Sequence, residues 1–119
     1  MRVLSCPFCK IIAGQTPARI LYQDEQATAF WDARPIAPVH VLIVPNEHIH
    51  SNNEVAAEHA ALLGHLNLVA ARLARELKVD QSGYRLVINT GPDAGQSVFH
   101  LHMHLIGGRR MPFSFQGGG

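Results

Sequence analysis

Residues 98–108 read VFHLHMHLIGG and place three of the chain's eight histidines at alternate positions, His100, His102 and His104. In a β-strand, side chains two residues apart lie on the same face. The alternation therefore predicts a strand with three imidazoles on one face and apolar side chains facing the core on the other. Those apolar residues are Leu101, Met103 and Leu105. Burying three unpaired imidazoles would cost several kcal/mol, so the pattern favours a functional site.

The composition is that of a folded protein of one domain. The chain has 119 residues, of which 47% are hydrophobic and 16% charged, and this suits a single domain over residues 1–119. The net charge is +1 without a run of Lys or Arg, so we expect no nucleic-acid partner. No segment reaches the ~18 apolar residues of a membrane span, and the N-terminus lacks a secretory signal. We therefore expect a cytoplasmic protein without a membrane partner.

Strand and helix patterns surround the histidine segment. Residues 19–32 read as an antiparallel hairpin about a polar turn at 24–26, and the continuously apolar VHVLIVP at 39–45 predicts a central strand. Residues 84–90 predict a further strand, and residues 6–14 one or two helical turns. Frequent hairpin turns around one long helix indicate an α+β fold with a mainly antiparallel sheet.

Residues 51–77 form the longest periodic stretch and predict one amphipathic helix. Its apolar residues recur about every 3.6 positions, as the buried stripe of a helix requires. They are Val55, Leu62, Leu66, Val69, Leu73 and Leu77. Ser51 with Glu54 fits a capping box at the start, although Asn53 fits the cap position equally well.

The opposite face of this helix carries small residues where a solvated helix would show charges. It comprises Ala57, Ala60, Ala61, Gly64, Leu68 and Ala71. A glycine inside a helix costs about 1 kcal/mol relative to alanine, so Gly64 indicates a packing role. The face is either a shallow alanine-rich surface or the contact for the same helix of a second copy. We favour the second interpretation, a homodimer.

The residues alone leave two functional interpretations of the three alternate histidines. Neutral imidazoles bind metals, but one strand spaces their nitrogens awkwardly for a single tetrahedral ion, so other ligands would have to complete such a site. Alternatively, the middle histidine attacks as a nucleophile and its neighbours bind or protonate the substrate. The preceding loop, NTGPDAGQS at 89–97, contains glycines and the donors Gln96 and Ser97, which suit a phosphate or an oxyanion.

The segment HLHMHLIGGR at 100–109 resembles the signature of the histidine triad (HIT) superfamily, and the rest of the chain resembles its Hint branch. The segments that carry the resemblance are IIAGQTPARILYQDE (11–25), AFWDARPIAPVHVLIVPNEHI (29–49) and YRLVINTGPDAGQSVFHLHMHLIGGR (84–109). The resemblance implies a mainly antiparallel five-stranded sheet with one long helix and a short N-terminal helix, and a homodimer joined through helix and sheet. It also implies a purine nucleoside phosphoramidase, which cleaves the P–N bond of adenosine and other purine nucleoside 5'-phosphoramidates without a catalytic metal and releases AMP.

The resemblance assigns roles to the residues at matching positions. His102 would be the nucleophile that becomes nucleotidylated, His104 a contact of the α-phosphate, and His40 a residue that orients the triad. Asp32, beside Ala33, would hold both ribose hydroxyls. The phosphate and leaving-group contacts would be Asn89, Gly95, Gln96 and Ser97, and the apolar walls around the base Phe8, Ile11, Phe30 and Leu42. Without the resemblance, Asp32 can be read as a turn residue and the apolar residues as ordinary core.

Cys6 and Cys9 indicate a second site, because this spacing in a cytoplasmic protein is more often metal-binding or redox-active than disulfide-forming. In a subset of HIT proteins, such a pair joins a histidine like His48 and the first triad histidine, here His100, around structural zinc. Two Cys and two His suit the tetrahedral preference of zinc. The alternative is two reduced thiols without a metal. His100 is therefore either a fourth catalytic residue or a zinc ligand.

Residues 110–119, RMPFSFQGGG, depart from the Hint branch, which usually has Trp and Pro here. Phe113 and Phe115 could replace those contacts with the neighbouring subunit, and we expect the closing glycines to be disordered. The remaining histidines read as surface or helix-flanking residues. They are His50, His59 and His65.

Three other functions compete with the phosphoramidase interpretation. A dinucleoside polyphosphate hydrolase would use the same triad, although that branch typically has Pro-Arg after its histidines where this chain has IGGR. A nucleotide-binding regulatory or scaffold protein would need no catalysis, and the intact set of His40, His102 and His104 weighs against it. A metal-storage or metal-sensing domain would explain the Cys and His content.

Overall fold

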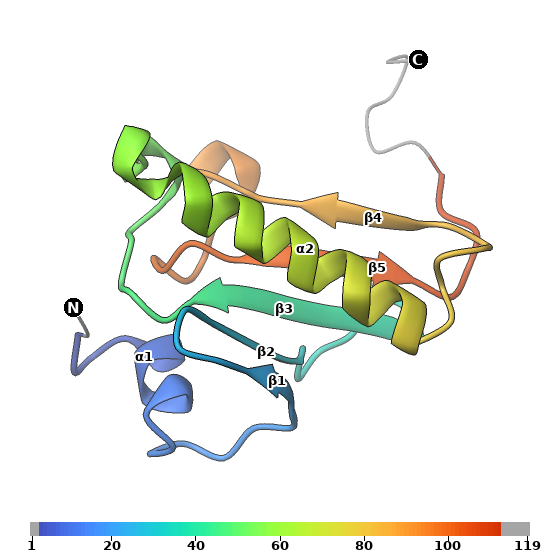
Figure 1. The fold of residues 1–119 in the computed structure, drawn as a ribbon, viewed down its shortest axis with the longest axis horizontal. Coiled ribbons are helices and arrows are strands. Elements are labelled where there is room, and N and C mark those ends of the chain that lie inside the picture. The colour runs from blue at the N-terminus through green and yellow to red at the C-terminus, as the bar shows by residue number, and fades with distance from the viewer. Residues whose placement is uncertain (1–2, 113–119) are drawn as a thin grey trace.

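The computed structural model describes residues 3–112, over which the chain forms one five-stranded antiparallel sheet and two α-helices (Figure 1). The expected features of Phe113, Phe115 and the closing glycines lie outside the described residues. The elements are α1 (Pro7–Ile12), β1 (Ile20–Gln23), β2 (Ala27–Trp31), β3 (Val39–Pro45), α2 (Ala60–Glu76), β4 (Tyr84–Val87) and β5 (Met103–Gly107). The strands lie in the order β1-β2-β3-β5-β4. The predicted fold class is confirmed.

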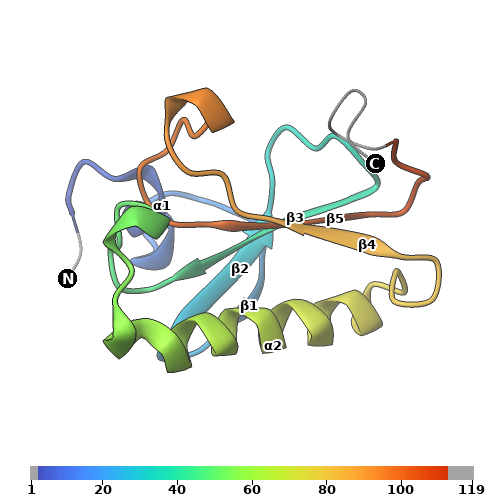
Figure 2. The same cartoon turned by 90° about the horizontal axis from the view of Figure 1, so that it is seen from above.

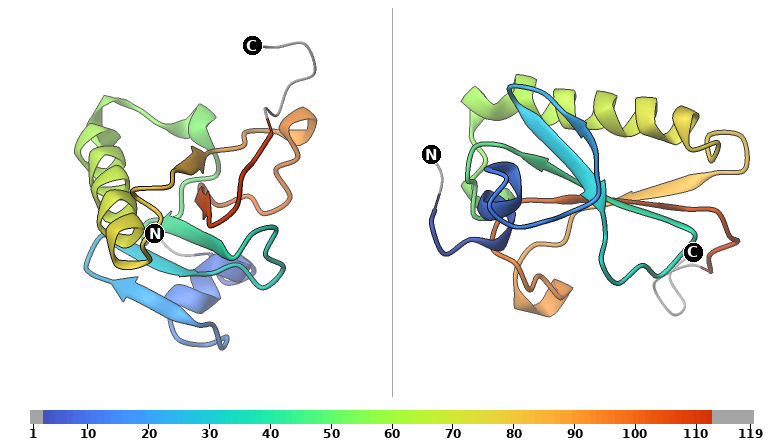
Figure 3. Two further views of the ribbon diagram at one scale, coloured as in Figure 1. Left: turned by 90° about the vertical axis from the view of Figure 1, so that its right-hand side faces the viewer. Right: turned by 90° about the horizontal axis from the view of Figure 1, so that it is seen from below.

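The sheet has one face covered by α2 and another from which the loops rise. Figure 2 shows α2 along one face, with the loop after β2 and the segment between β4 and β5 on the other side, and Figure 3 shows the same layers from two further directions. The latter segment contains the 3₁₀ turn η3 (Pro92–Ala94). The open face is therefore available for a site built from loops.

β3 lies at the centre of the sheet, and its successive side chains alternate between two apolar cores. Val41 and Ile43 pack with the buried stripe of α2. Leu42 and Val44 pack on the other face with residues of α1. This alternation also fixes the side of the sheet on which His40 lies, because His40 and Leu42 are two residues apart.

The long helix begins later than the periodicity predicts. Two 3₁₀ turns, η1 (Asn52–Glu54) and η2 (Ala57–His59), precede α2, and Ala56 between them is extended, with φ −127° and ψ 175°. The Ser51 side chain caps η1 by accepting from the N–H of Asn53, and Nδ1 of His59 accepts the N–H of Ala56. Expecting a single helix over 51–77 was therefore wrong at its start, because side-chain bonds there compete with helical hydrogen bonds.

The last strand is also shorter than predicted, since β5 begins at Met103 and not at residue 98. The chain before it bends, and the N–H of Leu101 donates to Ile49 O at 2.7 Å in the loop after β3. The apolar side of the alternation is confirmed within β5, because Met103 and Leu105 pack in the core beneath α2. Leu101, before the strand, is also buried. His100 and His102 therefore lie on an irregular segment that leads into the strand.

The remaining elements follow the predicted order with shorter bounds. The hairpin turn between β1 and β2 is held by Asp24, whose Oδ1 accepts the N–H groups of Gln26 and Ala27. The strand expected at 84–90 ends at Val87. Within residues 3–112, no helix is long and apolar enough to cross a membrane.

Candidate active site

Hydrogen bonding fixes the tautomer of the neutral His102 ring. Nδ1 of His102 lies 2.8 Å from the carbonyl oxygen of His100. A carbonyl oxygen can only accept, so Nδ1 carries the proton and donates. Nε2 of the neutral ring therefore keeps its lone pair, which is what a nucleophilic imidazole needs.

A chain of hydrogen bonds fixes the neighbouring His104 in the opposite tautomer, with the proton on Nε2. The N–H of Ile36 donates to Nδ1 of His40 at 3.2 Å, so in the neutral ring Nε2 of His40 carries the proton. That nitrogen lies 2.9 Å from Nδ1 of His104 and 3.3 Å from Oδ2 of Asp32. Nδ1 of His104 accepts, and its Nε2–H is left as a donor. The two rings, whose centroids are 5.0 Å apart, thus present one acceptor and one donor.

Burial keeps His40 and His104 neutral near neutral pH. With Asp32 beside them, these two rings form a hydrogen-bonded relay. It lowers the pKa of His104 to about 4, helped by the neighbouring His102 and His40 and opposed by Asp32. Burial likewise lowers the pKa of His40, and Asp32 opposes the shift. Both rings of the hydrogen-bond chain are therefore neutral.

His102 and His104 line a cleft of about 600 Å³ on the open face of the sheet. Seven of the residues assigned to nucleotide contacts line the same cleft. They are Phe8, Ile11, Phe30, Asp32, Ala33, Leu42 and Ser97. The cleft combines apolar side chains with the two imidazoles and a few other polar groups, which is the usual character of a small-molecule site.

Three other assigned residues, Asn89, Gly95 and Gln96, do not line this cleft. The Gln96 side chain is buried and holds its own loop in shape. Its oxygen accepts the N–H of Gly91, and its nitrogen donates to the carbonyls of His50 and Val98. Gly95 follows η3 in the left-handed region, with φ +85°, which favours glycine. Gln96 and Gly95 thereby fix the path of the chain that leads to Ser97.

Asn89 instead lines a second cleft of about 580 Å³, which shares His104 with the first. The second cleft also contains His40 and two arginines, Arg85 and Arg109. Arg85 donates to the carbonyls of Met111 and Pro112, and Arg109 to those of Ile36 and Arg110. His104 therefore stands between the two clefts. The first is named the apolar cleft for its Phe, Ile and Leu side chains, although Arg19 and Arg34 also line it, and the second the basic cleft for Arg85 and Arg109.

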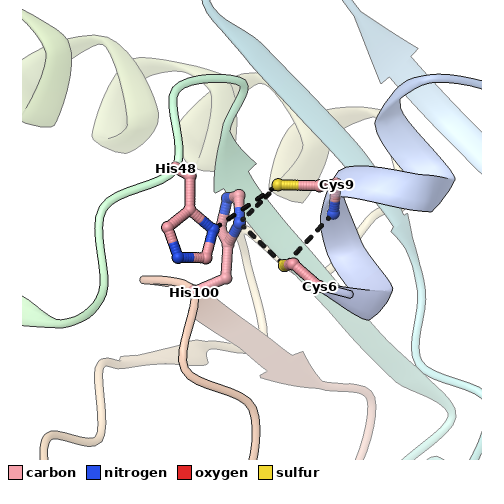
Figure 4. A group of neighbouring side chains, drawn as sticks. All are labelled: Cys6, Cys9, His48 and His100. Atoms are coloured by element: carbon pink, nitrogen blue, oxygen red, sulfur yellow. Dashed lines mark hydrogen bonds between the residues drawn. The ribbon is translucent and has the colours of Figure 1, made fainter. Parts of the chain in front are cut away.

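Four side chains from three separate segments meet in a second cluster, drawn in Figure 4. Cys6 and Cys9 come from α1 and its N-cap, His48 from the loop after β3, and His100 from the segment before β5. The ring of His100 donates from Nε2 to Pro45 O at 2.8 Å, so its unprotonated Nδ1 faces the sulfur atoms.

The geometry of this cluster fits a tetrahedral metal ion. Nδ1 of His100 lies 3.3 Å from Sγ of Cys6 and 3.6 Å from Sγ of Cys9, and Nδ1 of His48 lies 3.4 Å from Sγ of Cys9. Zinc bonds of about 2.3 Å to sulfur and 2.0–2.1 Å to nitrogen place such ligands about 3.6 Å apart. Backbone N–H groups of Cys9 and Val3 support the two sulfur atoms, as outer contacts of a metal site do.

The protonation states of the cluster's side chains also suit the binding of a metal ion. Burial lowers the pKa of His100 to about 4, and burial with the nearby His50 and the N-terminal amine lowers the pKa of His48. Both rings are therefore neutral and able to bind a cation. Burial raises the pKa of the Cys6 thiol, so a bound cation would be needed to stabilise the thiolate.

A family model described as the HIT domain matches residues 13–111. The chain belongs to the HIT family. It is 49% identical over 102 residues to the purine nucleoside phosphoramidase of Escherichia coli (strain K12), which covers 86% of each protein. The crystal structure of a HIT family hydrolase from Legionella pneumophila Philadelphia 1 matches with a TM-score of 0.91 and 42% identity, over 92% of this chain and 98% of that one.

A zinc-bound HIT relative also matches. The crystal structure of a Zn-bound histidine triad family protein from Mycobacterium smegmatis has a TM-score of 0.76 and 36% identity, over 89% of this chain and 76% of that one. That relative binds zinc within the same fold, and in this HIT chain Cys6, Cys9, His48 and His100 come together in a group that suits the same ion.

Several residues near this HIT site had no signal in the sequence. Arg19 lies over the ring of Trp31, with its guanidinium carbon 5.3 Å from the ring centroid, and both line the apolar cleft. Arg85 and Arg109 line the basic cleft. Isolated arginines carry no periodic pattern, so only the fold brings them to the site. His65, expected at the surface or flanking the helix, is half-buried on α2, and its Nε2 lies 2.6 Å from Oδ2 of Asp24 on the far side of the sheet.

Proposed function

We propose that this HIT protein is a purine nucleoside phosphoramidase that cleaves the P–N bond of nucleoside 5'-phosphoramidates. One observation carries the proposal: the bond from His102 to the His100 carbonyl leaves an unprotonated Nε2 on His102, next to the Nε2–H of His104 at the same cleft. An attacking lone pair and an adjacent donor are what substitution at phosphorus requires.

The reaction proceeds in two displacements at the α-phosphorus. Nε2 of His102 forms a bond to phosphorus as the P–N bond of the substrate breaks, and the leaving nitrogen takes up a proton from solvent and departs as the amine. Water then forms a P–O bond as the bond between phosphorus and His102 breaks, which releases AMP and a proton and restores the neutral ring. His104 donates from Nε2 to a nonbridging oxygen in both steps.

The cleft suits the nucleoside. Phe8, Ile11, Phe30 and Leu42 supply apolar lining, against which a purine would pack. The Asp32 carboxylate accepts the N–H of Arg34 through Oδ1 and lies near His40 through Oδ2. We propose that it also binds the ribose hydroxyls, with Ala33 beside it and Ser97 near the phosphate.

We propose that Cys6, Cys9, His48 and His100 bind structural zinc. The donor set and its spacing support this assignment. The ring of His100 then belongs to the zinc site, and its contribution to catalysis is the carbonyl oxygen that accepts from His102. Zinc would supply no chemistry to the reaction.

We further propose a cytoplasmic homodimer that packs through α2. Leu68 on the small-residue face is 68% exposed, and the space around Gly64 is open, with no described atom within 4 Å of a Cβ placed there. The Gly64→Glu variant is expected to shift the sedimentation profile to that of a monomer, and an unchanged dimer would contradict the helix contact.

The basic cleft favours one second candidate, a dinucleoside polyphosphate hydrolase. Arg85, Arg109 and Asn89 adjoin His104 on the side away from the base. A leaving group that carries phosphates would find cationic partners there.

The two candidates are separated by substrate. Turnover of adenosine 5'-phosphoramidate and of a dinucleoside polyphosphate is measured with and without a chelator, with His102→Ala as the control. Preferential turnover of the phosphoramidate supports the proposal, and preference for the polyphosphate supports the second candidate. Equal turnover by His102→Ala would contradict both.

A further inference from the structure

Helix α1 contributes to the cysteine cluster and to the cleft although it is only six residues long. Cys6 at its N-cap and Cys9 supply both sulfur atoms of the cluster, and Phe8 and Ile11 line the cleft. A helix this short is not stable by itself in water. Its position therefore depends on side-chain anchors, of which the two cysteines are a large part.

His100 contacts both the cysteine cluster, through its ring, and His102, through its carbonyl oxygen. Its ring is fully buried, with Nδ1 facing the cysteines and Nε2 bonded to Pro45. Its own carbonyl oxygen accepts from Nδ1 of His102. A shift of the backbone at His100 that follows loss of the cluster would move the carbonyl oxygen that accepts from the His102 ring.

Phe8 makes a second connection. Its ring meets that of His102 edge-on, with centroids 5.1 Å apart, and that of His100 at 5.9 Å. Phe8 lies between the two sulfur ligands in the sequence and cannot shift independently of them. The cluster thus reaches His102 by one hydrogen bond and one ring contact.

We propose that the Cys6–Cys9–His48–His100 cluster is a positioning device for the nucleotide site, which couples metal binding to nucleotide binding and to the orientation of the His102 ring. This inference rests on the proposed function for the identity of the nucleotide. The apolar core beneath α2 contains no residue of the cluster, so we expect metal loss to loosen α1 and residues 98–102 and to leave the sheet and α2 folded.

Coupling of this kind is reciprocal, because binding of metal must change AMP affinity by the same factor as AMP changes metal affinity. Couplings between sites in proteins commonly lie between about 5-fold and 150-fold. We expect about 10-fold weaker AMP binding by the metal-free protein than by the zinc-loaded protein. Calorimetric titration with AMP measures this, and circular dichroism checks that the secondary structure persists.

The His102 ring gives a readout that a merely structural role of the cluster would not move. In nitrogen NMR spectra of the zinc-loaded protein, the two ring nitrogens of His102 are expected to have well-separated signals, as in a fixed Nδ1–H form. In the metal-free protein, we expect these signals to move toward each other as the two neutral forms mix. This measurement needs no nucleotide.

Two variants sharpen the test. Phe8→Leu leaves all four ligands in place, so zinc content stays at one ion per chain, while the His102 signals, measured without nucleotide, shift because the edge-on ring contact is lost. His65→Gln removes the bond to Asp24 on the other face of the sheet and is the matched control. It is expected to leave AMP affinity and the His102 signals unchanged.

The outcomes separate this inference from the proposed function. If the zinc-loaded protein neither binds AMP nor turns over the phosphoramidate, the proposed function fails, and the NMR comparison alone decides the coupling. Unchanged His102 signals together with AMP affinity equal within about two-fold would overturn the coupling. Complete unfolding on zinc removal would also overturn it, because the cluster would then anchor the whole fold.

Discussion

Within residues 3–112, two clusters each bring two histidines together, one with two cysteines and one with an aspartate, and they differ in where the lone pairs of the rings point. In each, the ligand atoms lie within 4.8 Å of one another: Cys6, Cys9, His48 and His100 in one, Asp32, His40 and His104 in the other. In the first cluster, Nδ1 of His48 and of His100 faces the sulfur atoms. In the second, the nitrogens of His40 and His104 are paired at 2.9 Å, a hydrogen-bond distance.

A metal site and a proton relay can therefore be distinguished by the hydrogen-bond partner of each ring nitrogen. A ring whose outer nitrogen donates to a carbonyl offers a lone pair inward, as His100 does. A ring whose outer nitrogen accepts a backbone N–H offers a proton inward, as His40 does. The first arrangement suits a cation, and the second suits donation to His104 and then to an anion.

The largest effect is expected from removing the nucleophile. His102→Ala should lower kcat by at least about 10³-fold, since nucleophile loss commonly has effects of this size or larger. Zinc content should not change, because the ring of His102 is not in the metal cluster. Steady-state kinetics and elemental analysis check both, and a loss of zinc would show that the two clusters are not chemically distinct.

Breaking the metal cluster should mainly affect stability. Cys6→Ala is expected to abolish zinc binding and to lower the free energy of unfolding by about 3–4 kcal/mol relative to zinc-loaded protein, the contribution of a ligand present at several hundred times its Kd. Urea denaturation with and without a chelator measures this. A variant that still binds one zinc ion per chain with wild-type stability would remove Cys6 from the ligand set.

Weakening the relay should reduce turnover without changing zinc. Asp32→Asn removes the negative charge 3.3 Å from Nε2 of His40 and should lower kcat/KM by about 10²-fold, at the lower end of effects on proton-transfer groups. Asp32→Glu, which keeps the charge, is the matched comparison. If both variants turn over at the wild-type rate, Asp32 neither orients the relay nor binds the ribose.

The relay should also make stability depend on pH. The pKa of His104 is about 4 when folded, and about 6.5 when unfolded. As the pH falls from about 6.5 to about 4, the unfolded chain takes up a proton that the folded chain does not, so stability is lost on the order of 2 kcal/mol. Unfolding free energies of wild type and His104→Gln at both ends of this range are compared. Equal pH dependence would contradict a buried neutral His104.

The smallest effect is expected from His65, a histidine outside both clusters and on the other face of the sheet. His65→Gln should cost about 1 kcal/mol of stability, as loss of one partly exposed hydrogen bond does, and should leave turnover and zinc content unchanged. Thermal unfolding and a kinetic assay check this. A drop in turnover would mean that the far face of the sheet affects the site.

The periodic parts of the fold could be predicted from the sequence, and the irregular parts could not. The apolar run at 39–45 matches β3 residue for residue, because a buried central strand has no competing signal. The start of α2 is missed, since apolar spacing continues through Val55 while the side chains of Ser51 and His59 end the helical hydrogen bonds. Likewise, β5 starts late because the chain bends before it, where the N–H of Leu101 donates to Ile49 O in the loop after β3.

For the site, the resemblance supplied residue roles and the structure supplied the contacts that connect them. Seven assigned residues line one cleft with His102 and His104, but Gln96 holds its loop through its own amide. His100 has two roles, because its ring faces the cysteines and its carbonyl oxygen accepts from His102. Both roles depend on the path of the backbone, which no pattern in the sequence predicts. The basic cleft needs Arg85 and Arg109 from two strand ends and is equally invisible there.

The most direct test of the account is to trap the bond that His102 is expected to form. Zinc-loaded protein is mixed with adenosine 5'-phosphoramidate, quenched in acid-free denaturant during turnover, and digested for mass spectrometry. We expect one adenylyl group on the peptide that contains His102, formed and lost at rates that match turnover. We expect none in His102→Ala. Turnover without that adduct, or an adduct on His104 or His100, would contradict it.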